Sequence, residues 1–116
     1  CVMDPWYGLG SGDMLEVAHM GLHVAQMTGR EAMHQCFLAV TETPARILGL
    51  DGYGLAPGCN ADLVLLDAGS TVEAIRLRAA RRLVLRRGQV VSESPRARAQ
   101  LALPGRPGEI NFRLGR

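Results

Sequence analysis

The sequence predicts an α/β chain whose helices come first and whose strands follow. Residues 13–48 carry apolar side chains at helical spacing, whereas residues 62–91 carry short apolar runs rich in strand-forming residues. The two kinds of element do not alternate, so the pattern is not that of a self-sufficient layered βαβ fold. The 116 residues suffice for one modest domain, and the predicted helices need a sheet that the chain itself lacks.

Residues 13–27 are the first predicted helix. Apolar residues cover more than one helical stripe of this segment, which is typical of a largely buried helix. Ser11 and Asp13 each have a short polar side chain that can accept a hydrogen bond from a first-turn amide. Either residue could therefore cap the start of the helix.

Two more helices are predicted before the first turn-rich connection. Thr28 and Glu31 have the spacing of a capping box, ahead of an apolar run. Thr43 followed by Pro44 favours a short helix over residues 44–48, because proline is tolerated in a first helical turn. A glycine directly after this segment supplies the stop.

The second half of the sequence predicts strands. Glycines and prolines punctuate a connection after the third helix, and the apolar runs beyond it are short. Residues 71–80 are compatible with either a helix or a strand. Beyond Ser92, prolines and glycines predict an irregular tail. The predicted strands are residues 62–66, 83–85 and 89–91, the last two joined by a turn at 86–88.

The cysteines indicate a reducing compartment. There are three, at wide and irregular spacing and with no CxxC pair: Cys1, Cys36 and Cys59. An odd number in this pattern does not suit a disulfide framework, so we expect buried thiols and a cytoplasmic protein. The sequence has no apolar run of the roughly 20 residues that a membrane helix needs, and no membrane partner is expected.

The basic residues are unevenly distributed. Eleven of the thirteen arginines lie between Arg76 and Arg116, where only two glutamates oppose them. Such a stretch could bind nucleic-acid phosphates, but Phe112 is the only aromatic residue after Tyr53, so stacking platforms are lacking. A solvated surface or a subunit contact is the favoured interpretation, and a basic binding module remains an alternative.

Two stretches of the sequence resemble a known family. Residues 1–28, CVMDPWYGLGSGDMLEVAHMGLHVAQMT, are similar to the segment that follows the last barrel strand in microbial cytosine deaminases of the amidohydrolase superfamily. Residues 43–50, TPARILGL, and 53–67, YGLAPGCNADLVLLD, resemble the return of that superfamily from its barrel to a small β domain.

The resemblance implies a fold and a domain organisation. The chain is expected to be the C-terminal part of a metal-dependent hydrolase TIM barrel together with strands of a small composite β domain. A start at Cys1 rather than at methionine agrees with a piece of a larger enzyme. The implied parts are residues 1–58, the loop after the eighth strand and the closing helices; residues 59–94, strands of a small β-sandwich domain; and residues 95–116, an irregular tail.

The function that the resemblance implies is hydrolytic deamination of cytosine to uracil and ammonia. A divalent metal, iron or zinc, would lower the pKa of a bound water. Its ligands, and the acid and base that move protons, are expected upstream of Cys1, so the chain alone is expected to be inactive and to hold no metal. Another cyclic amine or amide, or an aminotriazine, remains an alternative substrate. The expected partners are a pyrimidine-like small molecule, the rest of the barrel or another chain, and copies of the protein in a homo-oligomer.

Trp6 is the predicted substrate-binding residue. It is the only tryptophan, it follows Pro5, which stiffens the backbone, and an indole can stack on a flat pyrimidine. The resembling family lines its substrate pocket with the tryptophan of this motif; the alternative is an aromatic residue that anchors the loop in the core. Asp4 immediately precedes proline and is typical of a turn, which favours structural support of the loop over acid–base catalysis. Cys1 falls where some relatives carry a second acidic residue.

Two further patterns invite a catalytic interpretation. Glu16, His19 and His23 can share one helical face and hold a zinc ion, but no glutamate lies between the histidines as it does in H-E-x-x-H. The family's histidines at these positions are not its metal ligands, and we expect a structural role, as for His34. The glycines at 8, 10 and 12 match neither a dinucleotide fingerprint nor a P-loop, so a mobile loop is favoured over a phosphate cradle.

Overall fold

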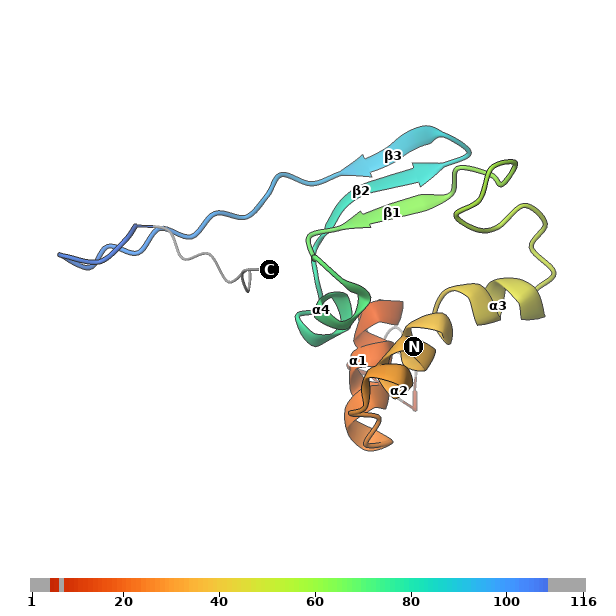
Figure 1. Cartoon of the computed structure of the whole chain (residues 1–116), viewed down its shortest axis with the longest axis horizontal. Helices are drawn as coiled ribbons and strands as arrows, with labels where there is room; N and C mark the ends of the chain where they lie inside the picture. Colours follow the sequence, from red (N-terminus) through yellow and green to blue (C-terminus); the bar gives the residue numbers. More distant parts are fainter. Residues whose placement is uncertain (1–4, 7, 109–116) are drawn as a thin grey trace.

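The computed structural model of the chain describes residues 5, 6 and 8–108. In this part a three-stranded antiparallel sheet lies over a group of helices, and the C-terminal segment runs away from both (Figure 1). The elements, in chain order, are α1 (Met14–Val24), α2 (Arg30–Leu38), α3 (Glu42–Ile47), β1 (Leu63–Leu66), α4 (Thr71–Arg76), β2 (Arg81–Arg86) and β3 (Gln89–Glu93). The predicted order of helices before strands is confirmed, with α4 as an insertion between two strands.

Helix α1 begins where the sequence predicts and ends earlier. The side chain of Asp13 caps it by accepting a hydrogen bond from the amide of Leu15, 2.7 Å away. The helix ends at Val24 because Gln26 adopts a left-handed conformation, with φ of 53°. The amide of Met27 then donates to the carbonyl of Leu22, which closes a Schellman motif with glutamine in the position that glycine usually takes.

The second predicted helix is confirmed as α2, but the capping box predicted at its start is wrong. Gly29 is the N-cap and makes no side-chain capping bond, so Thr28 and Glu31 do not form a capping box. The Glu31 carboxylate instead accepts a hydrogen bond from Gln35, one turn further along the helix, at 2.7 Å. A favourable i,i+4 partner therefore replaces the bond to the cap.

Helix α3 begins two residues earlier than the sequence predicts. It starts at Glu42, after the N-cap residue Thr41, whose hydroxyl donates to the carbonyl of Phe37 instead of capping α3. Pro44 consequently lies inside the first turn, where its missing N–H leaves no helical bond unmade. The predicted stop is confirmed, because Gly49 has a φ of 61° directly after the last turn.

Helix α4 occupies the segment for which both helix and strand remained possible. Ser70 accepts a hydrogen bond from the amide of Glu73 at 3.2 Å, and the Glu73 carboxylate accepts one from the amide of Gly69 at 3.0 Å. This reciprocal arrangement is close to a capping box. The Ser-x-x-Glu spacing that produces it is readable in the sequence.

The sheet has the strand order β1-β2-β3, and each neighbouring pair is antiparallel. The three predicted strands are confirmed. Arg87 and Gly88 connect β2 to β3, both with positive φ, as a tight type I′ hairpin requires. Asp62 holds this turn, because its carboxylate accepts from the amide of Arg87 at 2.6 Å and from the Arg86 guanidinium at 2.9 Å.

The hydrophobic core lies where α1, α2 and α4 meet. Ile75 of α4 is fully buried against Leu15, Ala18 and Cys36. The Cys36 thiol donates to the carbonyl of Ala18 at 3.2 Å, which ties α2 to α1. The prediction of buried thiols is confirmed for Cys36. Cys59 is also a free thiol but is only partly buried, and Cys1 lies outside the described residues.

The segment after β3 forms no helix or strand between residues 94 and 108, in agreement with the predicted irregular tail. It extends away from the sheet (Figure 1), and the radius of gyration of 16.9 Å exceeds the roughly 13 Å expected for a compact chain of this length. Arg96 binds Asp67 with two contacts of 3.1 Å, which holds the start of the segment near β1. Among the described residues, no helix is long and apolar enough to cross a membrane.

Replacing Ile75 with alanine tests the position of the core. Ile75→Ala removes a fully buried side chain that three helices share, and we expect the free energy of unfolding to fall by about 2–5 kcal/mol. Val91→Ala, at a position that is 60% exposed on β3, should change it by less than about 0.5 kcal/mol. Urea unfolding of both variants measures the difference, and equal effects would show that the core lies elsewhere.

Candidate functional site

The residues predicted to carry function lie just before α1. Trp6 is outside the hydrophobic core of the described residues and is 96% exposed. Asp4, Cys1 and Tyr7 lie outside the described residues. The role of Trp6 in substrate binding and that of Asp4 in loop support therefore stay predictions.

The segment between Trp6 and α1 is organised at its C-terminal end. The Ser11 hydroxyl donates to the Glu16 carboxylate in the first turns of α1 and accepts from the amide of Asp13 at 3.2 Å. Gly12 adopts a φ of 73°, which a residue with a side chain rarely adopts. The carboxylates of Asp13 and Glu16 both lie at this helix start, so the glycine-rich segment does not offer a phosphate an electropositive cradle.

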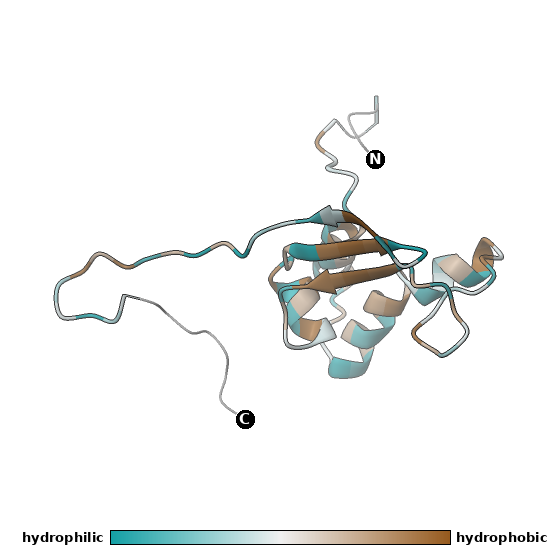
Figure 2. Cartoon of the chain, turned by 90° about the horizontal axis from the view of Figure 1, so that it is seen from above, coloured by the Kyte–Doolittle hydropathy of each residue, from teal (hydrophilic) through white to brown (hydrophobic). Residues whose placement is uncertain are grey.

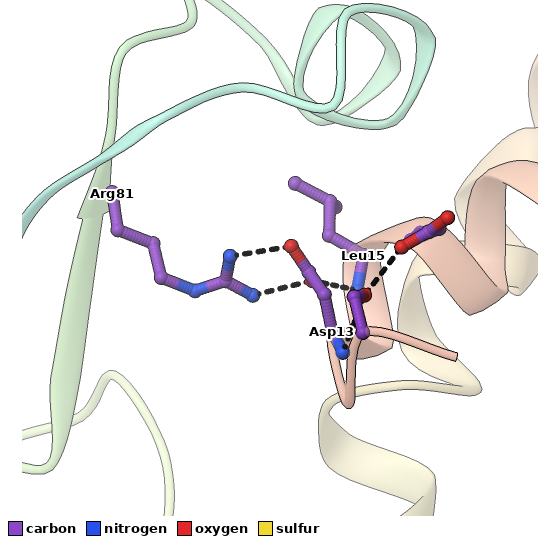
Figure 3. A network of polar contacts seen from close by, with 5 residues as sticks. Asp13, Leu15 and Arg81 are labelled. Atoms are coloured by element: carbon purple, nitrogen blue, oxygen red, sulfur yellow. Dashed lines mark hydrogen bonds and ion pairs between the residues drawn. The ribbon is translucent and has the colours of Figure 1, made fainter. Parts of the chain in front are cut away.

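A two-pronged ion pair connects this point to the sheet (Figure 3). Arg81, the first residue of β2, donates through Nη1 to Asp13 Oδ2 at 2.8 Å and through Nη2 to Asp13 Oδ1 at 2.7 Å. One carboxylate therefore caps α1 and accepts both prongs of the guanidinium. Sequence analysis did not identify this pair, whose members are 68 residues apart.

The pair changes the acid–base properties of both members. The hydrogen bonds from Arg81 and from the amide of Leu15 favour the charged carboxylate, and together with the positive charge they lower the pKa of Asp13 from 3.8 to about 2. Partial burial opposes this change. The same contact raises the pKa of Arg81 above its ordinary value. Both groups are therefore fully charged at neutral pH.

Two depressions flank the start of α1. The first is open, encloses about 650 Å³, and lies between the end of the glycine-rich segment and the α4–β2 connection, with Arg78 and Arg81 on one side and Asp13 and Glu16 on the other. The second encloses about 370 Å³ and is mostly apolar. It runs along α1, lined by Met14, Val17, Met20 and Val24 together with Gly10 to Gly12 and Gly21.

The apolar groove belongs to a larger uncovered surface. Met14, Val17, Met20 and Val24 recur at helical spacing on one side of α1, and each is about half exposed or more. The strands are also rich in apolar residues (Figure 2). Val64 and Leu65 are both more than half exposed, and because they are consecutive they face opposite sides of the sheet. Both the helical layer and the sheet thus present apolar surface that the described residues do not cover.

The residues Glu16, His19 and His23 do not form a metal centre. His19 Nδ1 lies 3.1 Å from the carbonyl of Ile75, and the rings of His19 and His23 meet edge to face at 4.6 Å. Glu16 accepts from Ser11 instead of facing the histidines as a third ligand. Among the described residues there is no group of three or more His, Cys, Asp or Glu side chains that could hold a metal ion. These residues therefore do not fit the divalent metal that the family implies.

Several arginines of the basic stretch are engaged within the chain. Arg81, Arg86 and Arg96 pair with Asp13, Asp62 and Asp67. These pairs connect the start of β2 to the start of α1, the end of β2 to the residue before β1, and the C-terminal segment to the residue after β1. Arg82 differs, because its buried Nη1 has no hydrogen-bond partner among the described residues.

Comparison with known proteins identifies the family. Residues 1–92 match the amidohydrolase family, and the chain therefore belongs to it. The matched region contains the Trp6 segment, all four helices and most of the sheet.

Three relatives indicate the chemistry found among similar proteins. The structure of a 5-methylcytosine deaminase from Klebsiella pneumoniae, liganded with 5-fluorocytosine, is 37% identical with a TM-score of 0.80 and covers 86% of this chain. That of an N-isopropylammelide isopropylaminohydrolase from Burkholderia multivorans is 40% identical with a TM-score of 0.75 over 79% of the chain. A pterin deaminase from Rhizobium rhizogenes is 34% identical over 78% of it.

The chain is much shorter than these proteins. It spans 24% of each of the two solved chains and 21% of the pterin deaminase. The similar proteins are hydrolytic amidohydrolases and deaminases with different named substrates, so the shared property is the reaction class.

The lowered pKa of Asp13 predicts a pH-dependent contribution to stability. Asp13→Asn removes the charge of the ion pair but keeps a good N-cap, so at neutral pH we expect it to cost about 1 kcal/mol, because solvent screens this partly exposed pair. The contribution of a carboxyl with a lowered pKa is present above the unfolded value of 3.8 and disappears as the pH falls through about 2. Urea unfolding from neutral pH to pH 2 should show the two proteins converging. A difference that does not vary with pH would contradict the ion pair.

Proposed function

We propose that this chain is the C-terminal part of a hydrolytic deaminase that converts cytosine and water to uracil and ammonia. The observation that carries the proposal is the likeness to the 5-methylcytosine deaminase, at 37% identity and a TM-score of 0.80 over 86% of the chain. That likeness includes a structure with a cytosine analogue bound in the relative.

The uncovered apolar surfaces support a larger fold around this chain. The stripe on α1 and the two faces of the sheet would be a poor surface for a separate domain, because contiguous exposed apolar areas favour association. We propose that the rest of a (β/α)8 barrel covers the stripe on α1. The small share of the relatives that the chain spans agrees with this arrangement.

In the proposed enzyme this chain supplies a wall of the substrate pocket. The loops that follow barrel strands form the active sites of this fold, and the segment that carries Trp6 corresponds to such a loop. The indole would stack on the flat pyrimidine ring and hold its face in a fixed plane. We place the iron or zinc ion of the family, and the groups that move protons, outside the described residues of this chain.

A second substrate class has its own support. The 40% identity to the N-isopropylammelide isopropylaminohydrolase and the 34% identity to the pterin deaminase favour another cyclic amine or amide, or an aminotriazine, within the same reaction class. The proposed stacking role of Trp6 suits any of these flat rings. A cytoplasmic location and assembly into a homo-oligomer also remain proposals.

Substitution of Trp6 tests the pocket assignment in the assembled enzyme, with this chain joined to the rest of the barrel. Trp6→Ala should raise the KM for cytosine by roughly 5- to 150-fold, because stacking of an aromatic side chain on a base contributes about 1–3 kcal/mol. Trp6→Phe should recover most of this loss. Steady-state ammonia release from cytosine, 5-methylcytosine, pterin and N-isopropylammelide measures both the effect and the substrate preference.

Leu55→Ala is the matched control for that experiment. Leu55 is 92% exposed but lies in the connection between α3 and β1, so its replacement should leave the KM unchanged. An unaltered KM for Trp6→Ala on every substrate would remove Trp6 from the pocket. Turnover of another ring with no turnover of cytosine would select the second substrate class.

The basic binding module makes a different prediction. If the arginines of the 76–116 stretch bound nucleic acid, the logarithm of the affinity would fall steeply and linearly with the logarithm of the salt concentration. We expect only weak binding, because three arginines of the described part already pair with carboxylates. Fluorescence titration of a labelled oligonucleotide at several salt concentrations measures the slope, and a steep slope with tight binding would reinstate this function.

A further inference from the structure

The contact between Asp13 and Arg81 lies at the C-terminal end of the segment that carries Trp6. Asp13 is the first residue after Gly8–Gly12, which leads from Trp6 to α1. Arg81 comes from beyond residue 58, where the small β domain is predicted to begin. The pair therefore connects the proposed pocket loop to the sheet across that boundary (Figure 3).

The core and the strand pairing hold the backbone of Arg81 in place. Ile75, six residues earlier, is fully buried in the core. Helix α4 then ends in a Schellman motif, in which Arg78 adopts a φ of 47° and the amide of Ala79 donates to the carbonyl of Ala74 at 2.9 Å. Only Ala80 separates this motif from β2, so the helix end and the strand pairing fix the start of the Arg81 side chain.

The geometry of the pair specifies a direction as well as a distance. Two parallel bonds from a planar guanidinium fix the plane of the Asp13 carboxylate, which a single contact would not do. The same carboxylate holds the amide of Leu15, and the amide of Asp13 holds Ser11. The orientation of Arg81 therefore constrains the orientation of the last residues of the glycine-rich segment.

Stability alone does not account for this arrangement. The Arg81 and Asp13 side chains are 40% and 30% exposed, so solvent screening limits the contribution of the pair to folding to about 1 kcal/mol even with its bidentate geometry. The packing of α1 against α2 and α4 is provided by the buried cluster around Ile75. What the pair adds is a fixed exit direction for a segment that three glycines would otherwise leave free.

We propose that Arg81 is a positioning residue that holds Asp13, and through it the Gly8–Gly12 segment, in the orientation that places Trp6 at the substrate. This inference rests on the proposed function for the role of Trp6. It adds a residue of the small sheet that touches no substrate but determines the position of the segment that lines the pocket.

The fluorescence of Trp6, the only tryptophan, tests the proposal in the chain itself. Arg81→Gln removes both prongs, Arg81→Lys keeps the charge but loses the fork, and Asp13→Ser keeps an N-cap without the ion pair. Arg86→Gln is the matched control, since Arg86 ends the same strand and pairs with Asp62. Far-UV circular dichroism establishes that each variant is folded.

Time-resolved anisotropy then reports the motion of the Trp6 segment on the nanosecond timescale. We expect Arg81→Gln and Asp13→Ser to lose the slow component that follows tumbling of the whole molecule, Arg81→Lys to keep part of it, and Arg86→Gln to match the wild type. Should Arg81→Gln fail to fold, the other two variants carry the test.

Two results would overturn the proposal: decays identical to the wild type in folded Asp13→Ser and Arg81→Lys, or an equal loss in Arg86→Gln. The measurement uses no substrate, so its failure leaves the proposed pocket role of Trp6 intact. Conversely, an unchanged KM in Trp6→Ala would remove that role and leave the anisotropy result standing.

Discussion

The bidentate contact between Asp13 and Arg81 is the interaction on which the arrangement of the N-terminal segment depends. A single carboxylate ends the glycine-rich segment, begins α1 and receives the first residue of β2. Because α4 leads from the buried Ile75 to that strand, the pair fixes the position of the segment relative to the core. In our proposal this one polar contact couples Trp6, the proposed pocket residue, to a sheet that lies far from it in sequence.

The rest of the molecule is built around a small core and large uncovered apolar surfaces. The buried cluster draws on only three helices, while one side of α1 and both faces of the sheet expose apolar side chains. Membership of the amidohydrolase family gives this imbalance a physical meaning, since the chain spans only 24% of each of the two solved relatives. The apolar surfaces that this chain leaves exposed are of the kind that a larger fold would bury.

Local chemistry made much of the fold predictable from the sequence. Asp13 as a cap, Gly49 as a stop and the hairpin at Arg87 depend on neighbouring residues alone. The capping box predicted at Thr28 is wrong because Gly29 takes the cap position. The Ser-x-x-Glu pattern that begins at Ser70 does cap α4, although the sequence prediction left this segment undecided. The partner of Asp13 could not be predicted, because one sequence does not say which of thirteen arginines meets a given carboxylate. Of the candidate site, the resemblance singled out Trp6, whereas Asp4 lies outside the described residues.

The most direct test of this account is a crystal structure of the chain assembled with the rest of the proposed barrel and bound to 5-fluorocytosine, the ligand found in the Klebsiella relative. The account predicts that the Trp6 indole lies in van der Waals contact with the face of the pyrimidine, while Arg81 keeps both bonds to Asp13. An indole turned away from the ligand and packed against protein would contradict the assignment of this segment to the pocket.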